Sequence, residues 1–264
     1  MNAVSDNLIH FLGQKDKERP DKQLEIFKSI INTGLRFNKW RIKFGSAGSL
    51  SDHIACFTDI PLSFCDDHVA EYGRFGIGFK KSAIKHCGGN PARYFIDSLP
   101  DVATDQMGHR WSMHANLRTH SEFVLKVHKR LKENADLKLQ DQHGQVLLEN
   151  DALQHWLDTQ TTIFSFEKET GDASNDRFYR EREWRLVPLR GSLRSGSIRQ
   201  DEIDGSYFYM FSREDINMIV TPDASVRAEV HKFLKELEEE DDDRLREFAT
   251  NPVPLVAYDE LQNW

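Results

Sequence analysis

The sequence predicts an α+β fold, in which a core built on a sheet is interrupted by a helical insert. Segments with strand character gather in two regions, at about 8–96 and 183–258, and each region includes an amphipathic helix. Between them, residues 101–176 are rich in His, Asp, Gln and Lys and contain helical patches. We therefore expect one domain over residues 1–264, with the insert at about 101–176.

Four strands and two helices are expected before the insert. Leu24, Phe27, Ile30 and Ile31 fall on one face of the first helix, and Gly34 provides its stop. The small residues at 45–53 indicate a flexible segment. The expected strands are 8–12, 55–61, 75–81 and 93–96, and the expected helices are 21–33 and 66–72.

In the expected strand at 75–81, large apolar residues alternate with glycines. Phe75, Ile77 and Phe79 point to one face, whereas Gly76 and Gly78 point to the other. The glycine face is therefore expected to be bare, which allows another group to approach the backbone closely.

Strand character returns after the insert. A last helix, from about 223, carries an apolar stripe and continues into the segment 236–243, in which seven of eight residues are acidic. We call this segment the acidic run; it favours a solvated helix end, with docking on a basic partner or mimicry of nucleic acid as the alternatives. The remaining expectations are helical patches at 117–133 and 151–166, and strands at 183–189, 206–211, 216–220 and 253–258.

Composition narrows the range of functions. Lys and Arg total 35 against 43 Asp and Glu, and the net charge of -8 does not favour general binding to nucleic acid. The three cysteines form no CxxC pair, which indicates reduced thiols in a cytoplasmic protein and no structural zinc site. No secretory signal and no apolar window of membrane-spanning length is visible, so neither secretion nor a membrane is expected.

The segment Tyr179-Arg180-Glu181-Arg182-Glu183-Trp184-Arg185-Leu186 is the most informative for chemistry. If it is a strand, Trp184 and Leu186 point into the core, while Glu181, Glu183 and Arg185 share the opposite face. Two carboxylates at this spacing could stabilise positive charge developing on a sugar. The alternative is an exposed strand face with ion pairs.

Two further features have both a functional and a plain interpretation. His10 lies in an apolar strand between Ile9 and Phe11. It could orient a ligand, or it could be a histidine of the core whose hydrogen bonds are satisfied there. The rings of Phe57 and Tyr72 could hold a flat heteroaromatic ring by stacking, or belong to the core. The histidines form no ligand set with metal-binding spacing, so no metal is expected.

One motif series resembles a known family. The run Cys56-Phe57-Thr58-Asp59-Ile60-Pro61-Leu62-Ser63 is followed by Asp67-His68, by Tyr72-Gly73-x-Phe75-Gly76-Ile77-Gly78-Phe79-Lys80-Lys81, by Asn90-Pro91 and Tyr94, and by Tyr179-x-Glu181-x-Glu183-Trp184-Arg185. Over about 5–100 and 175–190 the chain resembles the bacterial abortive-infection AbiGi family. That resemblance implies phage defence, and the family is usually labelled the antitoxin half of a two-gene system.

A more distant resemblance concerns the order of elements. The chain is similar to diphtheria-toxin-like and DarT-like ADP-ribosyltransferases, which implies a split antiparallel sheet core and NAD as substrate. It implies catalytic roles for Glu183 and, on the acceptor side, Glu181. It also implies an NAD-binding set: His10, Phe57, Thr58 and Tyr72. Two departures are the Phe at position 57 in place of Tyr and the long gap between Lys81 and Glu183.

These resemblances lead to three functional hypotheses. The first is a phage-defence toxin that transfers ADP-ribose from NAD to a macromolecular target, such as RNA or DNA, and that pairs with an antitoxin. The second is a non-enzymatic antitoxin that binds a cognate toxin protein. The third is a nuclease-like hydrolase, for which Asp66, Asp67, Glu181 and Glu183 would have to form a cluster of metal ligands.

Overall fold

The computed structural model describes residues 6–16, 19–43, 49–95 and 182–261, together with scattered positions between 120 and 169. Its internal contacts divide the chain into two compact units. The first unit comprises Met1–Asn38, His53–Pro91 and Glu181–Trp264, and the second comprises Lys39–Asp52 and Ala92–Arg180. Each unit is described by itself.

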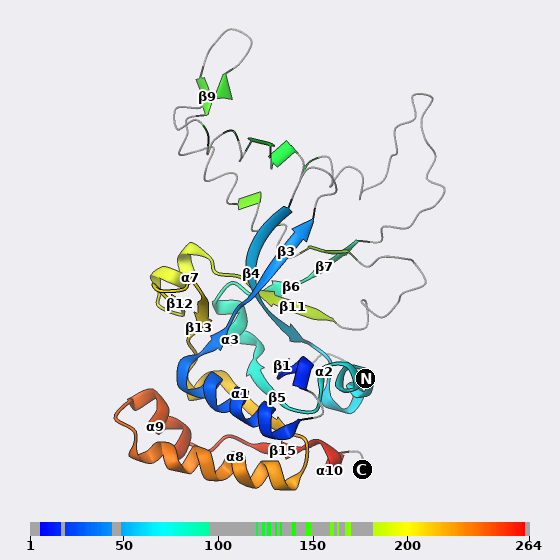
Figure 1. Cartoon of the computed structure of the whole chain (residues 1–264), viewed down its shortest axis with the longest axis vertical. Helices are drawn as coiled ribbons and strands as arrows, with labels where there is room; N and C mark the ends of the chain where they lie inside the picture. The colour runs from blue at the N-terminus through cyan, green and yellow to red at the C-terminus, as the bar shows by residue number, and fades with distance from the viewer. Residues whose placement is uncertain are drawn as a thin grey trace. The chain divides into compact units, whose positions relative to one another are not determined.

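The main sheet has eight strands and is mixed. Seven of them follow the order β15-β14-β5-β1-β4-β11-β6, and β3 pairs with β4 (Figure 1). The strands β14, β5, β1, β4, β11 and β6 pair antiparallel along this order, whereas β14 and β15 run parallel. The expected α+β class is confirmed, and the antiparallel sheet expected from the sequence is corrected to a mixed one. The strands are β1 (Asn7–Phe11), β3 (Asn38–Lys43), β4 (Ser49–Thr58), β5 (Gly76–Lys80), β6 (Asn90–Pro91), β11 (Glu183–Leu186), β14 (Ile216–Thr221) and β15 (Leu255–Ala257).

Helices and a small second sheet complete the first unit. The small sheet has the order β12-β13-β2, from β12 (Ile198–Gln200), β13 (Tyr207–Tyr209) and β2 (Leu35–Arg36). The α-helices are α1 (Pro20–Thr33), α2 (Asp66–Tyr72), α3 (Lys81–His86), α7 (Arg190–Arg194), α8 (Ala224–Glu236), α9 (Asp243–Thr250) and α10 (Tyr258–Leu261). The 3-10 helices are η1 (Gln14–Asp16), η3 (Leu62–Phe64), η4 (Arg213–Asp215) and η5 (Leu237–Glu239).

One face of the sheet carries the main hydrophobic core. Phe27 of α1, Phe233 of α8 and Phe248 of α9 pack into the same buried cluster as Phe79 of β5. The Phe79 ring meets Phe211 edge to face, with 5.2 Å between the ring centroids. Figure 1 shows α1 and α8 side by side, and they are also in contact. We call this the core face of the sheet.

The opposite face carries a smaller buried cluster. It contains Cys65, Val69 of α2, Val220 of β14 and Tyr258 of α10. The Tyr258 hydroxyl donates a hydrogen bond to the Asp66 carboxylate, at 2.5 Å, which joins α10 to the start of α2. We call this the second face.

The second unit contains β3 from Lys39 onward, the first residues of β4, and several short strands. β7 (Arg93–Phe95) pairs in parallel with β10 (Glu167–Glu169), and β8 (Leu139–Gln140) pairs with β9 (Val146–Leu148) in antiparallel fashion. The insert therefore includes strands, which its expected helical character did not anticipate. The helical patches expected at 117–133 and 151–166 lie largely outside the described residues.

Three local expectations are corrected by the structure. The strand β4 begins at Ser49, inside the segment expected to be flexible. The glycine face of β5 is filled, because a Cβ added to Gly78 would lie 2.6 Å from the Met218 Cγ of the neighbouring strand. The helix expected to be the last ends at Glu236, before most of the acidic run, and a further helix that was not predicted, α9, follows it.

Among the described residues, no helix combines the length and the apolar character needed to cross a bilayer.

Candidate functional site

The strands β1, β4 and β11 position most of the predicted site residues, and their register assigns each one to a face. Ile9 pairs with Thr58, and Thr58 pairs with Glu183, so Thr58 and Glu183 belong to the second face. His10 pairs with Ile77 of the core face, and its ring lies 5.8 Å from that of Phe57, which belongs to the main core. The structure thus brings Thr58 and Glu183 together and places His10 with Phe57, on opposite faces of the sheet.

The other two predicted residues have different outcomes. Tyr72 is the last residue of α2 and half-buried, and its ring lies 4.5 Å from that of His68, which in turn lies 5.4 Å from Phe11. Phe11 packs against the cluster of the second face, so this ring series lies on that side of the sheet. Glu181 lies outside the described residues.

Glu183 and Arg185 form a buried ion pair on one strand. Their side chains are 9% and 1% exposed, and the Arg185 Nε donates to the Glu183 Oε1 at 2.8 Å. Alternation along β11 puts both on the second face, while Trp184 and Leu186 join the core, as the sequence predicts. The alternative interpretation was an exposed strand face with ion pairs. The ion pair is present, but the face is buried, so the expected exposure is wrong.

A second buried pair lies one residue beyond the end of β4. The Lys81 Nζ donates to both carboxylate oxygens of Asp59, each at 2.8 Å. The same Nζ lies 5.5 Å from the centroid of the Trp184 ring, which adds a cation–π contact. Neither charged residue of this pair was identified as a site residue from the sequence, although Asp59 and Lys81 both belong to the motif series.

A strained residue adjoins both pairs. Arg182 has a φ of +43°, a left-handed conformation that is uncommon for a residue with a side chain. Its carbonyl accepts from the Asp59 N–H at 3.2 Å, and its guanidinium lies 3.9 Å from the Asp59 carboxylate. These contacts hold Arg182 in the conformation from which the chain enters β11.

His10 is held as a neutral donor. Its Nδ1 lies 2.8 Å from the Cys56 carbonyl oxygen, and because a carbonyl only accepts, Nδ1 carries the proton. Burial lowers the pKa of His10, and the hydrogen bond to Cys56 opposes this shift only in part. The Nδ1–H of His10 therefore joins β1 to β4, and the ligand-orienting role predicted for His10 stays a prediction.

We expect His10 to make folding stability depend on pH. The folded protein favours the neutral ring, so its contribution is complete above the unfolded pKa of about 6.5 and is lost as the pH falls below that value. Urea unfolding of the wild type and of His10→Gln should therefore show a difference in midpoint that shrinks from pH 7.5 to pH 5.5. His231→Gln, at an exposed position of α8, is the control; a difference that is constant with pH would contradict the assignment.

The described part of the chain also has a polar cavity of about 430 Å³ on the first unit. Lys80, His86 and Glu214 contribute charged or titratable groups to its lining, beside the Cys87 thiol and the Tyr209 phenol. Burial raises the pKa of both Cys87 and Tyr209, which keeps both groups neutral. Among the described residues, no group of three or more His, Cys, Asp or Glu is arranged to hold a metal ion.

The comparisons with known proteins give one match. The sequence model of a family described as an abortive phage resistance protein, AbiGi, antitoxin, matches residues 37–222, well over half of the chain. This chain belongs to the AbiGi family. Neither the curated proteins nor the solved structures yield a match.

The AbiGi match corrects the leading functional hypothesis. The family is described as an antitoxin, so the prediction of an ADP-ribosyltransferase toxin is wrong and the alternative antitoxin hypothesis is the better supported. The match is also wider than the resemblance seen in the sequence, since it includes the insert at 101–176 and the β12–β13 hairpin. It leaves out β1 with His10, and the acidic run.

The acidic run of this AbiGi chain is exposed apart from Leu237. Part of it serves to begin α9, since the Asp242 side chain accepts from the Arg244 N–H at 2.9 Å. Asp243 forms an ion pair with Arg246, one turn further along the helix. Its docking on a basic partner stays a prediction.

Proposed function

We propose that this chain is the antitoxin of an abortive-infection pair and that it neutralises its cognate toxin by direct contact. The observation that carries the proposal is the match to the AbiGi family over residues 37–222. The chain would then bind a protein and would not need an exposed catalytic group on its sheet.

The geometry of the sheet supports a binding role. Four charged side chains of the candidate site form two ion pairs within the chain, Glu183 with Arg185 and Asp59 with Lys81. The Glu183–Arg185 pair lies within one strand, whereas the Asp59–Lys81 pair joins the end of β4 to the start of α3. Breaking either pair would separate a buried charge from its partner, which favours the one local arrangement in which the pair is intact. A protein that acts by contact benefits from such rigidity, because a preorganised surface loses less entropy on binding.

A growth experiment tests the proposal. The chain expressed alone should leave growth unchanged, and co-expressed with the protein encoded by the neighbouring gene it should relieve the growth arrest that this toxin causes. Direct contact predicts in addition that the two purified proteins elute together in size-exclusion chromatography. Growth arrest by the chain alone would contradict the antitoxin assignment, and relief without a complex would contradict direct contact.

NAD stays a predicted ligand, and the ADP-ribosyltransferase-like arrangement stays a prediction about the fold. Both rest on the resemblance in element order. Calorimetric titration of the purified chain with NAD tests the ligand, and Tyr72→Ala, at the half-buried end of α2, should abolish any heat of binding if the ring stacks on it.

A further inference from the structure

The turn between β12 and β13 presents one apolar side chain to solvent. Ile203 is 97% exposed, more than any other large hydrophobic residue among those described. A single exposed hydrophobic residue is ordinary on a protein surface. Ile203 differs from such residues because a network of hydrogen bonds fixes the turn around it.

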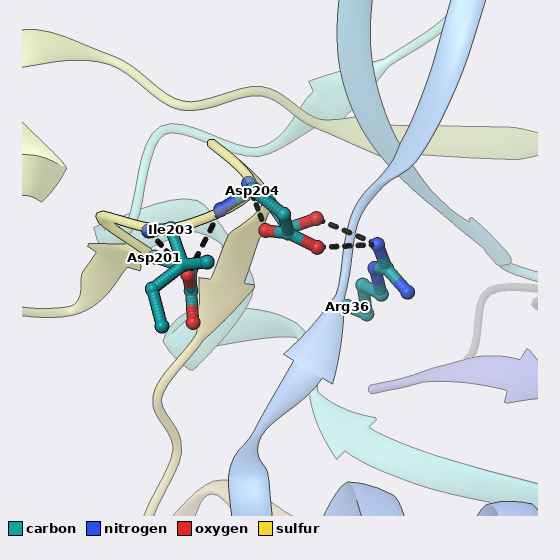
Figure 2. Close-up of polar contacts among 5 residues, drawn as sticks. Arg36, Asp201, Ile203 and Asp204 are labelled. Carbon is teal, nitrogen blue, oxygen red and sulfur yellow. Dashed lines mark hydrogen bonds and ion pairs between the residues drawn. The ribbon is translucent and has the colours of Figure 1, made fainter.

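The first layer of the network is formed by Asp201. Its Oδ1 accepts from the N–H of Ile203 at 2.8 Å and from that of Asp204 at 3.2 Å (Figure 2). Its backbone closes the turn, donating to the Ser206 carbonyl at 2.7 Å and accepting from the Gly205 N–H at 3.0 Å. Gly205 has a φ of +71°, which a side chain would disfavour.

The second layer ties the turn to the neighbouring strand. The Asp204 Oδ1 accepts from the Ser206 N–H at 2.8 Å, and its Oδ2 accepts from Arg36 of β2 at 3.1 Å. The same guanidinium donates to the Ser206 hydroxyl at 2.7 Å. Figure 2 shows Arg36 reaching Asp204 from the adjacent strand. The turn is therefore already ordered, and it would lose little conformational entropy on binding a partner.

The chemistry around Ile203 indicates what kind of surface it fits. Glu202 and Asp204 flank it directly, and Asp201 lies two residues before it. The hydrogen bonds from Ser206, helped by Arg36, lower the pKa of Asp204 and keep that carboxylate charged. Arg36 balances the charge of Asp204, so the negative charge that the turn offers a partner comes from Asp201 and Glu202. The complementary surface is an apolar pocket bordered by lysine or arginine side chains.

We propose that this turn is the anchor by which the chain binds its cognate toxin, with Ile203 inserted into an apolar pocket that has a basic rim. The inference rests on the proposed antitoxin function and adds the contact surface to it. A preorganised side chain loses little entropy on binding, and a few side chains that fill pockets on the partner carry most of the affinity of an interface.

Affinity measurements with the purified toxin from the neighbouring gene test the anchor. Ile203→Ala should weaken the Kd about 30-fold, the loss typical of a hot-spot residue. Ile203→Asp should weaken it on the order of 100-fold or more, because a charge would enter the pocket. Both variants should keep the wild-type melting temperature, since the side chain has almost no contact to lose. Phe64→Ala, at a 65% exposed residue of η3, is the matched control and should bind as the wild type does.

The outcomes separate the anchor from the function. If the wild type binds and neutralises the toxin while Ile203→Ala binds equally well, the anchor is wrong and the antitoxin function stands. If the wild type neither binds nor neutralises the toxin, the antitoxin function is wrong, and the proposed anchor is overturned with it. If Ile203→Ala instead dissociates a dimer of the chain, the turn joins two copies, which also overturns the proposal.

Discussion

Replacing Arg185 with methionine is expected to lower the free energy of unfolding by about 3–5 kcal/mol. Arg185 is 1% exposed, and its Nε donates to the Glu183 carboxylate at 2.8 Å. Methionine keeps much of the side-chain volume, so the main loss is the partner of a carboxylate that stays in the interior. Urea unfolding followed by circular dichroism measures the change.

The double variant tests whether charge is the cause. Glu183→Gln removes the negative charge that Arg185→Met leaves behind, so the double variant should be more stable than Arg185→Met alone. The interaction energy from the full double-mutant cycle, with Glu183→Gln measured alone as well, should be about 1–3 kcal/mol. Arg194→Met, at an exposed position of α7, is the control and should change stability by less than about 0.5 kcal/mol. A double variant no more stable than Arg185→Met would show that packing, not charge, explains the loss.

Replacing Lys81 with methionine should cost about 3 kcal/mol, somewhat less than the change at Arg185. The Nζ of Lys81 bonds both oxygens of Asp59, whose side chain is 8% exposed. Methionine can still pack on the Trp184 ring, which lies 5.5 Å from that Nζ. The change therefore removes chiefly the nearer of the two cations opposite Asp59. The Arg182 guanidinium, 3.9 Å from that carboxylate, remains, which is why the expected loss is smaller than at Arg185.

A matched control is available on the next turn of the same helix. The Lys85 Nζ lies 5.7 Å from the centroid of the same Trp184 ring, but Lys85 is exposed. Lys85→Met should therefore change stability by less than about 0.5 kcal/mol. Adding Asp59→Asn to Lys81→Met should restore part of the lost stability. Equal effects at Lys81 and Lys85 would mean that contact with the ring, and not the pair with Asp59, is what stabilises this corner.

These variants also bear on function. If the two pairs are structural, toxin neutralisation should fall only as far as the folded fraction falls, and it should return at lower temperature. Loss of neutralisation in a variant that remains fully folded would instead place the pair at the contact surface.

Much of the fold is determined locally and could be predicted from the sequence. The helix α2 has the bounds expected of it, and α1, β1, β5 and β14 agree with their predicted segments to within a residue or so. Periodicity decides such elements, because each presents an apolar face whose spacing is visible in the chain itself. The elements that were missed, α9, β2 and β12 among them, are short or follow charged sequence, where periodicity is weak.

The longer periodic strands and helices, the family motifs and the alternation of Glu183 with Trp184 along β11 could all be predicted from the sequence. Which of the predicted residues meet depends on the tertiary structure. His10 and Glu183 belong to strands on either side of β4, and the register Ile9 with Thr58 with Glu183 sends their side chains to opposite faces of the sheet. A shift of one residue would reverse this, and strand pairing between residues so far apart is set by packing of the whole core, which no local pattern records.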